Sequence, residues 1–312
     1  MKIQESCPLC CSKELVHIEK IKTHDLISLW LKKKINVKRI FKNINTLNKI
    51  KCNNCSLCFF DPSVSGDNTF YSALGKEEWY YLHEDKTEFG YSDGYIKYGD
   101  NILDIGSGRG IFQKYITKKI TYTGLELSKK AAEDASRDGI NVVEDTIEHY
   151  SKSNHNKYDV VVTFQVIEHI KNIDSFLKSS ISVIRSGGLL IIACPNNNSF
   201  IRKSQNNLWN LPPHHLLHWN RDSLEYIAKK YDLEIVDTYK EKVSNTHKDW
   251  YYATKIQEYI TNIFGLEKKS ISVSQFHIAI RKISFVLAKL LMFSSKYCKS
   301  DGHTIVMVFE KK

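Results

Sequence analysis

The stretch NILDIGSGRGIF (residues 101–112) decides the fold class of this chain. Its apolar start predicts a buried strand that ends on Asp104, and a helical pattern begins at its last two residues. Between them stand three glycines at alternate positions, Gly106, Gly108 and Gly110. Glycine has no Cβ atom, so a turn of this kind lets a ligand lie close to the backbone. The stretch therefore predicts a strand–turn–helix unit that binds a ligand.

Strand and helix patterns alternate along the chain after this stretch. Continuous apolar runs such as YDVVVTF (158–164) and GLLIIACP (188–195) predict strands that are buried on both faces. The segments between them read as helices, beginning with IFQKYITKK (111–119). We therefore predict an α/β fold with a doubly wound, mostly parallel, seven-stranded sheet. Ligands bind such sheets beyond the carboxyl ends of the strands, where Asp104 and the glycines are placed.

Acidic residues follow the next two strands and narrow the choice of ligand. Glu126 stands where a carboxylate can accept hydrogen bonds from both ribose hydroxyls, and Asp145 where it can accept one from an adenine amino group. The glycine spacing is GxGxG, not the GxGxxG of dinucleotide-binding proteins. Glu126 and Asp104 would repel a pyrophosphate but suit the cationic S-adenosylmethionine. The predicted cofactor contacts also include Ser107, Leu127, Thr146 and Gln165.

Cysteines are concentrated near the N-terminus. The pairs CPLC (7–10) and CNNC (52–55) are two CxxC turns, each of which places two thiolates within reach of one metal ion. Together they predict a structural zinc site with four ligands, Cys7, Cys10, Cys52 and Cys55. Disulfides are the alternative, which a cytoplasmic location disfavours. Cys11 or Cys58 could also replace one of the four ligands.

Several later segments resemble class I S-adenosylmethionine-dependent methyltransferases. LDIGSGRG (103–110) resembles their first motif and GLELS (124–128) their ribose-binding acid. DVVVTFQVIEHI (159–170) is similar to the post-strand motif of the branch with quinone and sugar methyltransferases. The turn, helix and strands of that branch resemble the segments IRSGGLLIIACPN (184–196), HHLLHWNRDSLEYIAKKYDLEIV (214–236) and GHTIVMVFEKK (302–312). The N-terminal knuckles add a looser resemblance to methyltransferases of bacterial sugar and surface-polysaccharide pathways, and the whole implies a Rossmann-like methyltransferase fold.

The domain organisation follows from these segments. We predict a zinc-ribbon-like module (1–62), a helical linker (63–98) and a methyltransferase domain (99–312) with a helical insertion (246–300). The linker carries the aromatic run WYY (79–81), which reads either as core packing or as a wall of the substrate site. The insertion departs from the family, whose last two strands are joined by a short hairpin. We predict helices near 249–264 and 276–297, the latter with Lys282, Lys289 and Lys296 near one face.

Histidines are the predicted bases. Methyl transfer to a hydroxyl needs a group that takes the proton, and histidine suits neutral pH. LPPHHLLHWN (211–220) offers three candidates after the fifth strand, His214, His215 and His218. We favour His215, because it would share a face with His218 in a helical segment, whereas His214 and His215 would point apart in an extended one. His169, just past the fourth strand, is a further candidate, with a structural role at a helix start as its alternative.

Composition sets the remaining limits. The net charge of +10 comes from basic residues near both ends, while the middle of the chain is mildly acidic. We expect no nucleic-acid partner, because basic residues interleaved with aromatics are not evident along one face. The basic ends could instead meet phosphates of a substrate or a membrane surface. The insertion could be a lid, an element that forms a homodimer or a helix on a membrane surface. No apolar leader or membrane-spanning run is evident, so we expect a cytoplasmic protein.

Three functional hypotheses follow. The first is a methyltransferase that acts on a small molecule, namely a nucleotide- or lipid-linked sugar in surface polysaccharide biosynthesis, with methyl transfer to oxygen or carbon. The second is a quinone-pathway or other small-molecule methyltransferase. The third is a zinc-ribbon binding module that carries a non-catalytic methyltransferase core. The intact set of Asp104, the three glycines, Glu126 and Asp145 argues against the third.

Overall fold

A seven-stranded sheet forms the centre of the computed structural model, which describes residues 5–75, 86–292 and 300–312. Its strands are β4 (Asn101–Ile105), β5 (Thr121–Leu125), β6 (Val142–Val143), β7 (Tyr158–Phe164), β8 (Ile184–Pro195), β10 (Leu233–Lys242) and β11 (Asp301–Lys311). They lie in the order β10-β11-β8-β7-β4-β5-β6. Only β11 runs antiparallel to its neighbours, β8 and β10, among the described strands of this sheet. The predicted mostly parallel seven-stranded α/β sheet is confirmed.

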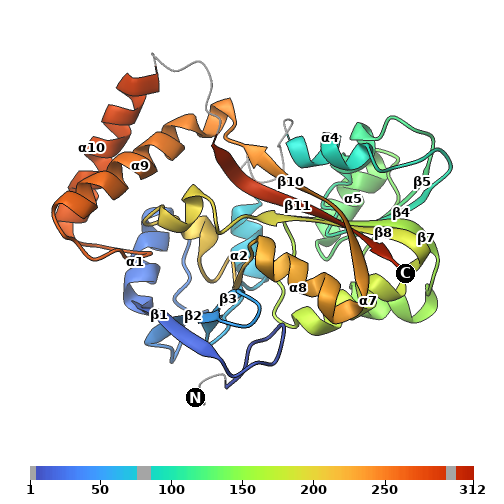
Figure 1. Cartoon of the computed structure of the whole chain (residues 1–312), viewed down its shortest axis with the longest axis horizontal. Coiled ribbons are helices and arrows are strands. Elements are labelled where there is room, and N and C mark those ends of the chain that lie inside the picture. The colour runs from blue at the N-terminus through green and yellow to red at the C-terminus, as the bar shows by residue number, and fades with distance from the viewer. Residues whose placement is uncertain (1–4, 76–85, 293–299) are drawn as a thin grey trace.

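Helices cover both faces of this sheet (Figure 1). On one face lie α4 (Thr87–Asp93) and α5 (Lys129–Arg137), and on the other lie α6 (Ile147–Tyr150), α7 (Ile173–Ser182) and α8 (Arg221–Tyr231). Alternate residues of a strand point to opposite faces, so Ile102 of β4 packs in the core under α5 and Leu103 in the core under α7. The continuous apolar runs of the sequence are therefore strands buried on both sides.

Local sequence signals explain where these helices begin. The Ser128 hydroxyl accepts a hydrogen bond from the Ala131 amide at 3.3 Å and caps α5. Asn220 and Ser223 form a capping box at the start of α8, in which each side chain accepts from the other's backbone amide. Both helices then present their apolar stripe to the sheet, and this burial stabilises them more than propensity does.

The helix predicted over 111–119 is wrong. Only Ile111–Tyr115 (η1) is helical, as a short 3-10 segment, and the backbone of Ile116 is extended with φ −78° and ψ 120°. Next to it, Asp93 accepts hydrogen bonds from the Thr117 amide at 3.1 Å and from its hydroxyl at 2.9 Å. The Asp93 carboxylate thus takes the amide that a continuing helix would need, and the β-branched residues here favour the extended form.

The N-terminal residues form a second, four-stranded sheet that takes a strand from far along the chain. Its order is β1 (Leu15–Lys22), β2 (Thr46–Cys52), β3 (Cys58–Asp61) and β9 (Leu217–His218). Because β9 lies between β8 and α8 in the chain, this sheet is tied directly to the larger one (Figure 1). Between the strands β1 and β2 lies the amphipathic helix α1 (Thr23–Lys32), which buries Leu26, Leu29 and Trp30. The helix α2 (Asn68–Leu74) packs beside it in the same apolar cluster.

The insertion before the last strand is a pair of helices. These are α9 (Lys248–Ile263) and α10 (Gln275–Met292), which pack against each other and project from the end of the larger sheet (Figure 1). Lys282 and Lys289 are both exposed on α10. Lys296 and the aromatic run 79–81 lie outside the described residues. Within the described part of the chain, no helix combines the length and apolarity that a membrane span requires.

Candidate functional site

The glycine turn leaves the carboxyl end of β4 with three consecutive glycines of the motif in the left-handed region. The φ angles are +74° at Gly106, +56° at Gly108 and +70° at Gly110. A Cβ atom at Gly106 would lie 2.4 Å from Cγ2 of Val166, and one at Gly110 would lie 2.5 Å from Cγ2 of Ile140. The chain's own packing thus requires two of these glycines, in addition to the close ligand approach that the sequence suggested.

Glu126 at the end of β5 holds this turn in place. One carboxylate oxygen accepts a hydrogen bond from the Gly108 amide at 3.0 Å, and the other accepts one from the Ser128 amide at 2.7 Å. A carboxylate offers about four acceptor positions, so two remain for another donor. Leu127, the next residue, is 69% exposed and presents an apolar side chain at the same edge. An adenosine with its two ribose hydroxyls fits this combination.

The other predicted cofactor contacts lie around the same edge with defined partners. Asp104 is buried and accepts a hydrogen bond from the Tyr122 hydroxyl at 2.6 Å, and burial raises its pKa to about 7. Asp145 contacts the His149 ring at 2.8 Å, and Thr146 caps α6. Ser107 stands within the turn, and Gln165 follows β7 with φ +58°. Their roles toward a cofactor stay predictions.

Three of the four candidate histidines form one cluster beyond the carboxyl end of β7. The ring of His169 lies 4.6 Å from that of His214 and 4.9 Å from that of His215, centroid to centroid. His214 and His215 stack on each other at 4.6 Å. The turn after β7 brings Val166 against Gly106, so the cluster adjoins the glycine turn. The structure thus places the histidines next to the predicted cofactor edge.

Three expectations about these histidines are wrong. His214 and His215 do not point apart, because the segment is a tight turn in which both amides donate to the Leu211 carbonyl, at 3.0 and 3.1 Å. His215 and His218 do not share a helical face, because His218 belongs to the strand β9 and its Nε2 donates to the Asn210 carbonyl at 2.6 Å. His169 stands in a turn that ends before α7 begins at Ile173, so it does not start a helix.

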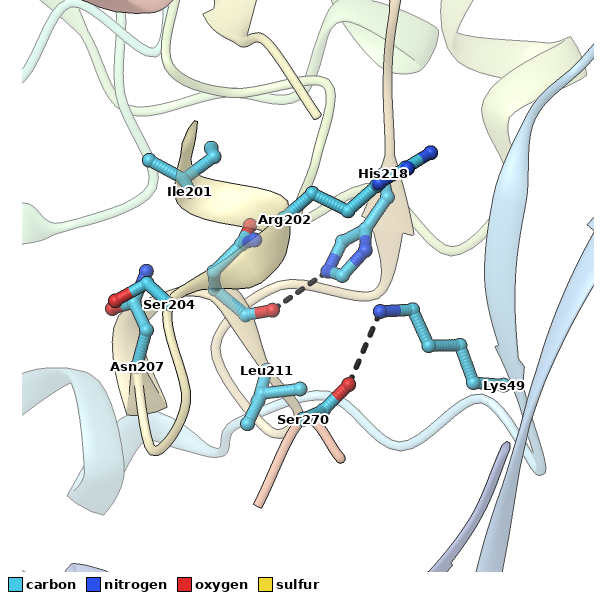
Figure 2. Close-up of a pocket in the computed structure, with 9 residues that line it drawn as sticks. Lys49, Ile201, Arg202, Ser204, Asn207, Leu211, His218 and Ser270 are labelled. Atoms are coloured by element: carbon cyan, nitrogen blue, oxygen red, sulfur yellow. Dashed lines mark hydrogen bonds between the residues drawn. The ribbon is translucent and has the colours of Figure 1, made fainter. Parts of the chain in front are cut away.

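His218 faces a different place, a small polar pocket that is also lined by Lys49, by side chains of the segment 201–211 and by Ser270 (Figure 2). Lys49 of β2 lines this pocket and donates to the Ser270 hydroxyl at 3.2 Å, and burial lowers its pKa. The free volume is about 10 Å³, the space of about one water molecule. This pocket is too small for a methyl acceptor, and His218 is separated from the other candidates.

Sequence reasoning missed Glu168, which lies at the centre of the histidine cluster. Its side chain is 1% exposed, and neither carboxylate oxygen has a hydrogen-bond partner in the described part of the chain. Oε1 lies 3.9 Å from Nε2 of His169 and 3.9 Å from Nε2 of His215. Burial raises the pKa of Glu168 to about 8, so the uncharged acid predominates at pH 7. The motif VIEHI contains it, but no spacing rule distinguished it from a surface acid.

Asn210 was also missed, and it orients the cluster. Its amide nitrogen donates to Oδ1 of Asn197 at 2.8 Å, which turns its Oδ1 toward Nδ1 of His215 at 3.1 Å. Nδ1 of His169 faces the His214 carbonyl at 2.6 Å. In both rings Nδ1 therefore carries the hydrogen and Nε2 the lone pair. Burial lowers the pKa of His169 to about 4 and that of His215 well below its usual value, so both rings are neutral at pH 7.

Further polar side chains extend this region toward the antiparallel edge of the sheet. Glu241 of β10 lies 3.2 Å from Nδ1 of His303 of β11, and the two are joined in one cluster with His247. The charges of Glu241 and His303 shift the pKa of the buried Glu88 in opposite directions, and His303 lowers that of His215. These side chains therefore lie within electrostatic reach of one another.

The four predicted zinc ligands come together. The sulfurs of Cys7 and Cys55 lie 3.5 Å apart and those of Cys10 and Cys52 lie 3.4 Å apart, with one sulfur from each residue within 4.8 Å of the others. Four thiolates about 2.3 Å from one zinc ion would be separated by about 3.8 Å. Cys11 is exposed and Cys58 is half-buried, and neither belongs to the cluster. The arrangement is compatible with zinc, and the metal itself stays a prediction.

We expect Cys52→Ser to remove one equivalent of zinc per chain and to lower the melting temperature, because ligation energy is folding energy in a small metal module. Lys230 of α8 donates to the Leu9 carbonyl at 2.6 Å, so loosening of the knuckles should also reach α8. Elemental analysis and thermal unfolding measure both effects. Cys11→Ser is the control and should change neither. Equal zinc content in Cys52→Ser and wild type would refute the assignment.

Comparisons with known proteins point to one family. A family model described as methyltransferase domain matches residues 76–238, more than half of the chain. The ubiquinone biosynthesis O-methyltransferase of Vibrio parahaemolyticus is 29% identical over 108 residues, which cover 32% of this chain and 46% of the relative. That of Proteus mirabilis is also 29% identical over 108 residues, with 32% and 44% covered. The chain thus spans about half the length of these curated relatives.

Solved structures show more distant likenesses. A SAM-dependent methyltransferase from Archaeoglobus fulgidus is 20% identical with a TM-score of 0.46, covering 71% of this chain and 90% of that one. Phosphoethanolamine N-methyltransferase 2 of Haemonchus contortus, in complex with S-adenosyl-L-methionine, is 15% identical with a TM-score of 0.49, covering 77% and 57%. The family assignment rests on the matched domain together with the sheet order and glycine turn described above. The chain belongs to the methyltransferase domain family, with the Rossmann-like fold of the class I S-adenosylmethionine-dependent enzymes.

Proposed function

We propose that this chain transfers a methyl group from S-adenosylmethionine to a hydroxyl group of a small, polar acceptor, namely a nucleotide- or lipid-linked sugar. The observation that carries the proposal is the set of side chains at one edge of the larger sheet. There Glu126 holds the glycine turn, and Val166, in the turn that leads on to Glu168 and His169, packs against Gly106. The nearby histidine cluster includes Glu168 and His215. Family membership supports the methyl donor, and the polar character of the neighbouring region supports the acceptor.

The chemistry needs two contributions from the chain. S-adenosylmethionine, when bound, supplies an electrophilic methyl group on a cationic sulfur. Glu126 would hold its ribose, and Asp145 its adenine, at the carboxyl edge of the sheet. His215 would accept the proton of the acceptor hydroxyl at Nε2, because its Nδ1 is fixed as the donor to Asn210. Burial of the cluster excludes water from this proton transfer.

The acceptor class follows from the side chains around the cluster. Glu88, Glu168 and Glu241 are all buried, at 5%, 1% and 5% exposure, and His303 lies 3.2 Å from Glu241. A site with many buried hydrogen-bonding groups binds a ligand with several hydroxyls more tightly than a ligand that leaves those groups unpaired. A sugar offers such hydroxyls. A quinol with an apolar tail is the second candidate, favoured by the names of the curated relatives.

A methyl-release assay on a panel of acceptors tests this choice. The panel contains nucleotide-sugars, lipid-linked sugars and demethylated quinols, each at the same concentration with S-adenosylmethionine. We expect turnover with at least one sugar and none with the quinols. Turnover only with quinols would replace the sugar by the second candidate. Tight S-adenosylmethionine binding without turnover on any acceptor would favour the non-catalytic binding module.

We expect Glu126→Ala to weaken S-adenosylmethionine binding by about 1.5–3 kcal/mol, or roughly 10- to 150-fold in Kd, because hydrogen bonds to a charged group contribute that much. The substitution also frees the Gly108 amide, so the turn loses its tie to β5. Isothermal titration calorimetry with S-adenosylmethionine measures the change.

The matched control for this variant is Glu133→Ala. Glu133 lies on α5 with a side chain that is 59% exposed, and it forms an ion pair with Lys129 at 4.0 Å. Exposed pairs of this kind contribute little, so its Kd should equal that of wild type. An unchanged Kd in Glu126→Ala would remove Glu126 from the cofactor site.

A further inference from the structure

The distances between three ligand-type atoms in the histidine cluster fit the binding of one cation. Three ligand-type atoms meet there: Oε1 of Glu168 and the Nε2 atoms of His169 and His215, each nitrogen 3.9 Å from the oxygen. Two ligand atoms that are each about 2.0–2.2 Å from one metal ion lie about 3–4.2 Å apart, depending on the angle between them. A distance of 3.9 Å is too long for a hydrogen bond but falls in that range.

The orientation of both rings favours metal binding over hydrogen bonding. Nδ1 of His169 faces the His214 carbonyl and Nδ1 of His215 faces Oδ1 of Asn210. Metal-ligating histidines usually donate their other ring nitrogen to a carbonyl or a carboxylate in this way, which fixes the ring and points its lone pair at the metal. Asn210 is itself fixed by Asn197. The structure therefore contains the supporting hydrogen bonds as well as the ligand atoms.

Glu168 provides the second, independent observation. Its carboxyl group is 1% exposed, and both of its oxygens lack a hydrogen-bond partner among the described residues. A buried polar group without a partner costs about 1–3 kcal/mol, and more when it is charged. A proton on Glu168 cannot close either 3.9 Å gap. A divalent cation between the carboxylate and the two imidazoles would satisfy all three groups at once.

We propose that Glu168, His169 and His215 bind a divalent transition-metal ion of the class that prefers imidazole ligands, such as Zn²⁺ or Fe²⁺. Imidazole nitrogen favours these ions over Mg²⁺ and Ca²⁺, and two histidines with one carboxylate leave coordination positions open. A ring nitrogen of His214 also lies within 4.8 Å of one from each of the other two histidines, so a third imidazole is at hand. This site is separate from the cluster of four cysteines.

The role of this metal rests on the proposed function. An open coordination position beside the glycine turn would take the acceptor hydroxyl, and the cation would lower the pKa of that hydroxyl. With its Nε2 on the cation, His215 would act as a ligand in place of acting as the base, and the acidified hydroxyl would release its proton to solvent as it takes the methyl group. Loss of His215 would lower turnover in either role. The metal site itself does not depend on methyl transfer, and it is tested by metal binding alone.

The experiment counts zinc in the full-length protein, with Zn²⁺ as the probe. The purified chain is incubated with excess Zn²⁺, desalted and analysed for metal per chain. Wild type should hold two equivalents, one in the cysteine cluster and one here. Glu168→Gln keeps the size of the side chain but removes the anionic ligand, and it should hold one. His215→Gln should also hold one.

His218→Gln is the matched control, because His218 is an equally buried histidine of the same segment that faces the other pocket. It should keep both equivalents. Asn210→Ala removes the group that orients His215 and should weaken the second zinc by about 10- to 100-fold. Equal zinc content in wild type, Glu168→Gln and His215→Gln would overturn the proposal.

X-ray absorption at the zinc edge of the wild-type protein gives a readout that needs no variant. We expect a mixed shell of sulfur and nitrogen or oxygen, with the outer-shell signal of imidazole. A shell of sulfur alone would overturn the proposal, even if the variants failed to fold. S-adenosylmethionine titrations on the same samples report separately on the proposed function, because Glu126 and the glycine turn lie outside the metal ligands.

Discussion

His215→Ala is expected to lower methyl-transfer turnover by about 10²–10⁴-fold, the range that a general base contributes. His215 presents Nε2 toward Glu168 with its Nδ1 fixed by Asn210, so its loss removes a proton acceptor that is already oriented. S-adenosylmethionine affinity should stay within about twofold of wild type, because Glu126 and the glycine turn are untouched. Turnover on the real acceptor and calorimetry with the cofactor measure the two quantities.

His218→Ala serves as the comparison for this result. It removes a buried histidine from the same segment, but one that contacts the Asn210 carbonyl and the small pocket instead of Glu168. Its turnover should fall much less than that of His215→Ala. Near wild-type turnover in His214→Ala, His215→Ala and His218→Ala alike would exclude base catalysis from this segment. His169 would then be the remaining histidine candidate of the cluster.

Trp219→Ala is expected to lower the free energy of unfolding by about 3–5 kcal/mol, the usual loss for a buried tryptophan. Trp219 is 0% exposed and follows β9 directly. It packs in one apolar cluster with residues of the cysteine knuckles, including Cys52 and Phe59, and with Leu224 of α8. The cavity would therefore open where the two sheets meet. Denaturant unfolding at 25 °C measures the loss.

Tyr98→Ala is the comparison for stability, because Tyr98 is 77% exposed and its removal should change the free energy of unfolding by less than about 0.5 kcal/mol. We also expect Trp219→Ala to lower zinc retention in the cysteine cluster, since the same cavity adjoins Cys7 and Cys52. A loss below about 1 kcal/mol would show that the two sheets are not stabilised by this contact.

Much of the fold could be predicted because its signals are local. The strand β7 (Tyr158–Phe164) matches the predicted run 158–164 residue for residue, since a continuous apolar run between turn residues fits a strand buried on both faces. The Ser128 cap of α5 is equally local, because its hydroxyl reaches an amide three residues away. The failed helix at 111–119 shows the limit of this reasoning, because Asp93 competes from outside the segment.

The candidate site divides in the same way. Sequence by itself determined the glycine turn, Glu126 and the two cysteine pairs, because each follows from a short spacing that backbone geometry imposes. Only the tertiary structure brought His215 next to the neighbouring residues Glu168 and His169. His215 is distant from this pair in the chain, and they meet because the segments after β7 and β8 leave the sheet at the same edge. The tertiary structure also separated His218 from them, since β9 pairs with β3 of the N-terminal sheet. Burial and long-range strand pairing decide which side chains face one another, and no local pattern encodes either.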